Sequence, residues 1–180
     1  MTSARRFCIF GLVLWLLVGA LPGFPPGFAD EAPPPSPRLG SSDNTPRLFA
    51  FAQALLEEGE YYRAIGEFQR FLFFYAEHPL APQAQLRIGM AFFCGERWLQ
   101  AFEVFRRVAQ AAPDTPIGQA AALWMAETRA QGGDHSQAIR LYQEVITQYP
   151  GTFAAQRAAY LIGWSLLRKH QWTEAHSAMA

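Results

Sequence analysis

Residues 86–113 read LRIGMAFFCGERWLQAFEVFRRVAQAAP, and this stretch holds one complete copy of a pattern that recurs along the chain. A small residue, Gly89, is followed twelve positions later by Ala101 and four positions after that by the aromatic Phe105. The same positions recur every 37 residues, and a fixed period of this length predicts a solenoid of stacked units. The repeated positions are the small residues Ala52, Gly89, Ala126 and Gly163, the alanines Ala64, Ala101, Ala138 and Ala175, and the aromatics Phe68, Phe105 and Tyr142.

Each unit is predicted to contain two helices joined by a short turn. From Leu86 to Val108, apolar residues recur at positions i, i+3, i+4 and i+7, which is the spacing of an α-helix that buries one face. The pattern breaks at Gly95-Glu96, and the neighbouring units break at the equivalent pairs Glu58-Gly59 and Gly132-Gly133. Because glycine favours the left-handed turn that ends a helix, these pairs mark the end of the first helix.

The repeated small residues are predicted to lie where the two helices of a unit cross. Antiparallel helices approach closely only where the facing side chains are small, and a larger side chain there costs roughly 1–3 kcal/mol by overpacking. The aromatic of each unit then fills the space against the next unit. The unit is therefore expected to be a tightly crossed helix–turn–helix.

The order of small residue, alanine, aromatic and, eight positions later, proline (Pro113 and Pro150) resembles the tetratricopeptide repeat (TPR) over about residues 46–180. The resemblance implies an all-α fold, a TPR-like α-solenoid of antiparallel helix pairs with a 37-residue period. Three complete repeats and one partial repeat are expected, at residues 46–82, 83–118, 119–155 and 156–180.

The units are longer than is usual for the family, and the extra length falls after the proline, as in Asp114–Ala120. This lengthening resembles the periplasmic TPR proteins of Gram-negative bacteria, of the BamD and YbgF types. One departure concerns Arg129, which takes a position that is apolar in the other units (Leu55, Phe92 and Leu166), so unit three is expected to pack more loosely.

The N-terminal sequence is typical of an export signal. Arg5-Arg6 precede a fifteen-residue uncharged apolar run, Phe7–Leu21, and Gly27-Phe28-Ala29 forms a small-x-small cleavage site before Asp30. We expect residues 1–29 to be a signal peptide and residues 30–45, rich in Pro, Ser and Gly, to be a flexible linker. The protein is then exported and periplasmic. The alternative is a membrane association in which residues 7–21 stay uncleaved as an anchor.

Composition argues against several classes of function. Basic and acidic residues number 15 each, and the basic residues are dispersed, with Lys169 the only lysine. Because nucleic-acid binding needs a concentrated basic surface, none is expected. His170 and His176 are six positions apart, which misses the i, i+4 spacing of a helical metal pair, and no phosphate loop or nucleophile motif occurs. We therefore expect no enzyme activity, no cofactor and no metal site.

The TPR resemblance assigns the face of the first helices to a concave groove that binds a partner. Amphipathic helices or extended peptides could use its apolar rows as anchors, with Glu127 and Arg168 setting orientation. The alternative is a tightly wound superhelix in which these rows pack on neighbouring helices. The candidate groove residues are Phe49, Gln53, Leu56, Leu86, Met90, Phe93, Leu123, Glu127, Tyr160, Trp164, Leu167 and Arg168.

A second candidate surface is the aromatic pair Phe73 and Phe74. These rings align with Gln110-Ala111 and Thr147-Gln148, which are expected to face solvent. They predict either a contact site, for a partner, the membrane surface or further chain, or a cover over the exposed end of the solenoid.

The function that follows is a non-catalytic protein–protein interaction scaffold of the bacterial cell envelope, in outer-membrane assembly or envelope coordination. Its partner is expected to be a protein or peptide of the envelope. The register places Ala180 part-way through a helix, so the alternative is the N-terminal TPR adaptor of a larger envelope enzyme or transporter whose active part lies beyond residue 180.

Overall fold

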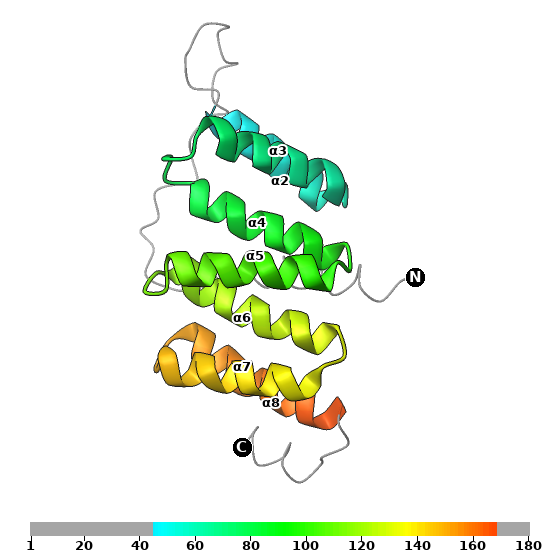
Figure 1. The fold of residues 1–180 in the computed structure, drawn as a ribbon, viewed down its shortest axis with the longest axis vertical. Coiled ribbons are helices and arrows are strands. Elements are labelled where there is room, and N and C mark those ends of the chain that lie inside the picture. Colours follow the sequence, from blue (N-terminus) through cyan, green and yellow to red (C-terminus); the bar gives the residue numbers. More distant parts are fainter. Residues whose placement is uncertain (1–44, 169–180) are drawn as a thin grey trace, which may run out of the picture. The chain divides into compact units, whose positions relative to one another are not determined.

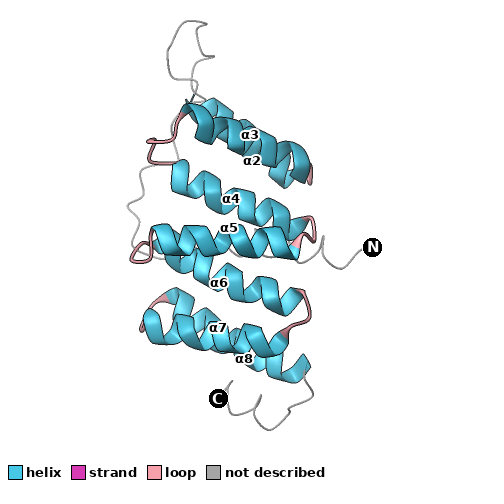
Figure 2. Ribbon diagram, in the orientation of Figure 1, coloured by secondary structure: helices cyan, strands magenta, loops and turns pink. Residues whose placement is uncertain are grey.

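The computed structural model describes residues 45–168, and every regular element in this range is an α-helix (Figures 1 and 2). The expected signal peptide, most of the linker and the second helix of the partial repeat lie outside the described residues. The helices are α2 (Thr45–Glu57), α3 (Tyr61–Phe74), α4 (Ala81–Cys94), α5 (Trp98–Ala111), α6 (Pro116–Gln131), α7 (His135–Gln148) and α8 (Phe153–Arg168).

Helices α2 to α7 form consecutive antiparallel pairs that stack on one another, and α8 follows them in the stack as the first helix of the next unit (Figure 1). The second helix of each pair packs on the first helix of the next, α3 on α4, α5 on α6 and α7 on α8. Successive first helices also touch, α4 with α6 and α6 with α8. The predicted all-α solenoid of helix pairs is confirmed. Its first helices begin slightly ahead of the expected unit boundaries, for example at Ala81 rather than residue 83.

The repeated small residues lie at closely packed positions inside the pairs. Ala52, Ala64 and Ala101 are completely buried. A Cβ atom built on Gly89 would lie 2.5 Å from a carbon of the Phe105 ring, so this glycine lets the ring approach α4 directly. The Phe105 ring in turn stacks on Trp124 of the next pair, with centroids 6.1 Å apart, as predicted for the aromatic position.

Two side chains cap the first turns of helices α6 and α7. The Thr115 hydroxyl accepts a hydrogen bond from the backbone N–H of Gly118 at 3.1 Å and donates to the Ala112 carbonyl at 2.7 Å. The Asp134 carboxylate accepts from the backbone N–H of Gln137 at 3.1 Å. Each cap satisfies a backbone donor that the first turn of a helix leaves free.

Arg129 is held by an aromatic ring of the preceding pair. Its guanidinium carbon lies 4.0 Å from the ring centroid of Phe102 on α5. A cation over the face of an aromatic ring is stabilised by the ring's quadrupole. The guanidinium of Arg129 therefore has a defined contact, at a position that is apolar in the other units. Its charge can be accommodated without looser packing of unit three.

In the turn between the two helices of unit two, the left-handed residue is not the glycine. The left-handed residue is the second of each pair, Gly59 with φ +83°, Glu96 with φ +59° and Gly133 with φ +90°. In unit two the glycine stands one position early, because Gly95 has φ −82° and Glu96 takes the left-handed conformation. An L-residue with a side chain is strained there, whereas glycine is not.

Glu96→Gly is therefore expected to raise the free energy of unfolding by about 1 kcal/mol, because it relieves the left-handed strain. Gly133→Ala, at the equivalent turn of the next unit, is expected to lower it by a similar amount. Urea denaturation followed by circular dichroism measures both, and a lower midpoint for Glu96→Gly contradicts this reading of the turn.

Candidate functional site

Two expected groove residues of the first pair belong to its core. The Phe49 ring packs edge-on against Phe68 and Phe71 of α3, with centroids 5.5 and 5.6 Å apart. Leu56 is buried in the same cluster. Gln53, between them, is half-buried and donates to Glu57 at 3.1 Å.

The expected groove residues of the second pair, Leu86, Met90 and Phe93, are also buried. The Phe93 ring lies edge-on to Trp98 of α5 and to Trp124 of α6, with centroid distances of 5.3 and 5.2 Å. Phe93 thus joins two successive units. In units one and two, the apolar residues of these rows are therefore part of the packed core and do not line an open groove.

Glu127 of the third pair is engaged within the protein. The Tyr142 hydroxyl on α7 donates to its Oε2 at 2.8 Å, and the Gln131 amide donates to its Oε1 at 3.1 Å. Burial, and then the Glu127 carboxylate, raise the pKa of Tyr142, so the hydroxyl stays a donor. The guanidinium of Arg157, on α8, acts in the opposite direction on that pKa. Leu123, in the same unit, is half-buried.

Aromatic and basic side chains share one face of α8, on which Arg157 is half-buried and the others are exposed. Tyr160 and Trp164 are 48% and 49% exposed, and their rings lie edge-on with centroids 6.4 Å apart. The Arg157 guanidinium carbon lies 5.5 Å from the Tyr160 ring centroid. The α8 sequence contains no acidic residue. We call this surface the α8 stripe, and its members are Phe153, Arg157, Tyr160, Trp164 and Arg168.

Three members of the α8 stripe, Tyr160, Trp164 and Arg168, are among the residues expected from the repeat register. Two others, Phe153 and Arg157, are additional. Their spacing of seven and three positions before Tyr160 places them on the same helix face, and this helical spacing is the signal that could have found them. Leu167 is half-buried beside the stripe.

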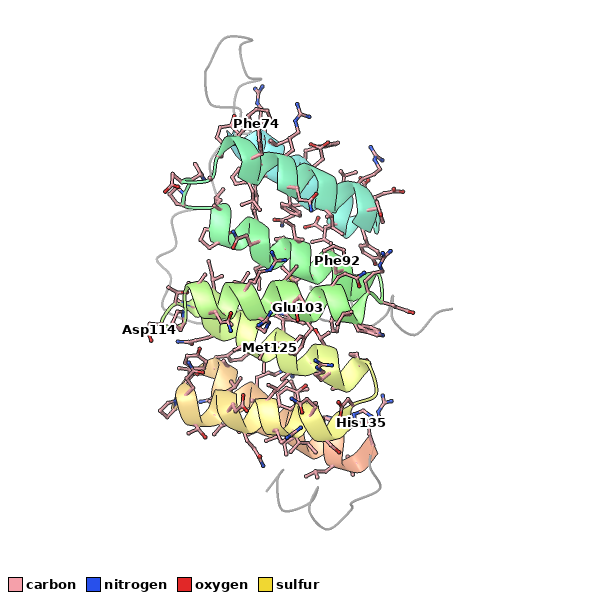
Figure 3. All side chains as sticks on the ribbon, viewed as in Figure 1. Phe74, Phe92, Glu103, Asp114, Met125 and His135 are labelled. Carbon is pink, nitrogen blue, oxygen red and sulfur yellow. The ribbon has the colours of Figure 1, made fainter. Side chains whose placement is uncertain are left out.

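The aromatic pair Phe73 and Phe74 is exposed on α3. The two side chains are 82% and 61% exposed, and their rings lie edge-on with centroids 5.1 Å apart. Phe74 lies at the outer edge of the first helix pair, on the side away from α4 (Figure 3). The pair is therefore available for contact at this end of the stack.

Within residues 45–168, no group of three or more His, Cys, Asp or Glu residues could hold a metal ion. Over the same range, none of the helices combines the length and the apolar character needed to cross a bilayer. An open hollow of about 300 Å³ between the turns of the first two pairs is lined mainly by aromatic and aliphatic groups, among them Tyr61, Ile65 and Phe92.

Comparison with known families agrees with this architecture. Two models, each described as Tetratricopeptide repeat, match the sequence, one over residues 49–116 and the other over residues 120–152. The chain is a tetratricopeptide repeat protein. None of the curated proteins matches its sequence.

Solved structures share the fold of this TPR protein at low sequence identity. MamA from Desulfovibrio magneticus RS-1 is 20% identical, with a TM-score of 0.59 over 74% of this chain and 71% of that chain. The nearly identical TPR-like repeats of a Podosopora anserina protein are 15% identical, with a TM-score of 0.63 over 98% and 87%. PcrH, solved in complex with the chaperone binding region of PopD, is 18% identical, with a TM-score of 0.58 over 74% and 99%.

Proposed function

We propose that this TPR protein is an exported, non-catalytic scaffold of the bacterial cell envelope that holds a protein or peptide partner on the α8 stripe. Outer-membrane assembly and envelope coordination are the processes that the resemblance to periplasmic TPR proteins suggests. The observation that carries the proposal is the exposure of Tyr160 and Trp164 on a first helix, where the equivalent side chains Leu86 and Met90 are buried.

The composition of the α8 stripe suits a peptide ligand. Tyr, Trp and Arg are the residue types that most often dominate binding energy at protein interfaces. The two exposed rings offer flat apolar anchors, while Arg157 and Arg168 add positive charge that no carboxylate on α8 offsets. A partner segment with apolar anchors and acidic residues fits this surface. PcrH, which shares the fold, was solved with a region of another protein bound to it.

The envelope location is supported by the N-terminal sequence. Arg5-Arg6, the apolar run Phe7–Leu21 and Gly27-Phe28-Ala29 have the order and lengths of a signal peptide. Cleavage before Asp30 releases the TPR region, whereas an uncleaved run holds it at the membrane. Both outcomes place the helix pairs in the same compartment.

The proposed partner site is tested by Tyr160→Ala combined with Trp164→Ala. The whole chain carries a C-terminal tag, is crosslinked in intact cells and is recovered from the envelope fraction. Loss of the two anchors is expected to reduce partner recovery at least about tenfold, as truncation of hot-spot residues does. Circular dichroism is expected to be unchanged, because both side chains are half-exposed.

Tyr62→Ala is the matched control, since Tyr62 is an exposed aromatic on a second helix. It should recover the partner at the level of the unmodified chain. Equal recovery from all three proteins would remove the α8 stripe from the proposal. The intact mass of the same material reports the N-terminus, and a chain found only in the cytosol with residues 1–29 attached contradicts export.

A further inference from the structure

The first helices of the later pairs share a buried row at equivalent repeat positions. On α4 this row contacts Phe68 and Phe71 of α3 within one hydrophobic cluster. In each helix the central residue is large and its neighbours are small, and all the row's members are buried or half-buried. The row consists of Ala84, Ile88 and Ala91 on α4, Ala121, Met125 and Thr128 on α6, and Ala158, Ile162 and Ser165 on α8.

The same face of α2 is open. The register places Arg47, Phe51 and Ala54 at the equivalent positions, and all three are exposed, with Phe51 at 48%. Glu58 continues this face, because its backbone N–H still bonds the Ala54 carbonyl at 2.9 Å. We call these four residues, Arg47, Phe51, Ala54 and Glu58, the α2 stripe. A phenylalanine at a stacking position thus faces outward at the end of the stack.

Two copies of the α2 stripe are complementary when the helices that carry them run antiparallel. Its members are spaced by four, three and four positions, the spacing of a helix-packing seam. In an antiparallel pair of α2 helices, Arg47 of one lies opposite Glu58 of the other, and Phe51 lies opposite the small Ala54. Charge and size therefore match at all four contacts around one central point, midway between Ala52 and Gln53.

We infer that two copies of this chain associate through the α2 stripe, with the two α2 helices antiparallel across a two-fold axis. Such an interface is isologous, so each contact occurs twice, and two-fold dimers are the commonest closed assemblies. The two Phe51 rings fill the holes above the partner's alanines, and the two Arg–Glu pairs fix the register. Phe74, exposed at the same end of the stack, adds apolar surface there (Figure 3).

The inference is tested by mass measurements on the purified protein after expression of the whole 180-residue sequence. Sedimentation equilibrium over about 1 to 200 μM is expected to show a monomer–dimer equilibrium. Phe51→Ser is expected to weaken the dimer at least about tenfold. Leu99→Ser, at an exposed leucine on α5, is expected to leave it unchanged.

Charge exchange separates this interface from non-specific association. Arg47→Glu alone sets two carboxylates opposite each other at both ends of its homodimer interface, and Glu58→Arg alone sets two guanidinium groups there. Because like charges then face each other, each variant is expected to dimerise at least about tenfold more weakly. An equimolar mixture of the two variants brings opposite charges together at both ends of the mixed dimer and is expected to recover association.

A monomer at every concentration, or a dimer insensitive to Phe51→Ser, overturns the inference and leaves the α2 stripe to a different occupant. A mixture of charge variants no more dimeric than either alone also overturns it. The measurement contains no envelope partner, so its failure leaves the proposed function of the α8 stripe unaffected.

Discussion

Gly118→Ala is expected to lower the free energy of unfolding by at least about 2 kcal/mol, at the upper end of the usual cost of overpacking. A Cβ atom at this position would overlap the carbonyl oxygen of Ala112 and lie 2.7 Å from its carbonyl carbon. Both are backbone atoms at the end of α5, so no side-chain rotation relieves the clash. The start of α6 would have to shift, which also disturbs both hydrogen bonds of the Thr115 hydroxyl.

Gly66→Ala provides the matched control for this change. Gly66 lies within α3, and a Cβ atom there has no neighbour within 4 Å. Alanine is the better helix former, so this variant is expected to gain about 0.5–1 kcal/mol. Urea denaturation of the two variants should move the midpoint in opposite directions. A shift of the same sign and size in both would contradict the close approach of α6 to Ala112.

Ala101→Leu is expected to destabilise the protein by roughly 1–3 kcal/mol, because it inserts a branched side chain into the helix crossing. Ala101 is completely buried, so α4 and α5 would have to separate to admit the added atoms. The separation would also disturb the contact of the Phe105 ring with Gly89.

Gln110→Leu introduces the same side chain at an exposed position of the same helix. Its effect on the free energy of unfolding is expected to stay within about 0.5 kcal/mol, as for most surface substitutions. Denaturation midpoints that coincide for the two leucine variants would mean that the repeated alanine does not lie at a tight crossing.

The paired helices could be predicted from sequence because their crossings depend on contacts within one unit. Each crossing needs a small residue, an alanine twelve positions later and an aromatic ring, and these recur in register. Ala52, Ala64 and Phe68 are all completely buried, as this pattern requires.

How closely two units approach depends on pairs of residues, and a single repeat position does not reveal these pairs. At the end of the second helix, Tyr75 and Tyr149 occupy the position that Ala112 takes in unit two. Where the tyrosines stand, the residue six positions later is alanine, whereas at Ala112 it is Gly118. A small side chain at the helix end thus coincides with a closer approach of the next helix, and only the structure shows the distance that makes glycine necessary there.

The candidate site illustrates the same limit. Met90 and Trp164 share one repeat position, yet the first is buried and the second is half-exposed. Periodicity assigns both to one face of a first helix, but burial depends on what packs over that face in each unit. Glu127, at the same position in unit three, is held by the Tyr142 hydroxyl on a neighbouring helix. The sequence therefore predicts which residues form the row. Which of them are exposed depends on the packing and is seen only in the structure.

The central functional claim, that a partner binds along the α8 stripe, is tested most directly by site-specific photo-crosslinking in intact cells. A photoreactive phenylalanine analogue replaces Tyr160 in one version of the whole chain and Tyr62 in another. Both side chains are exposed, so both probes reach solvent. A discrete crosslinked adduct with an envelope protein is expected from position 160 and none from position 62. The same adduct from both positions, or an adduct from position 62 alone, would contradict the claim.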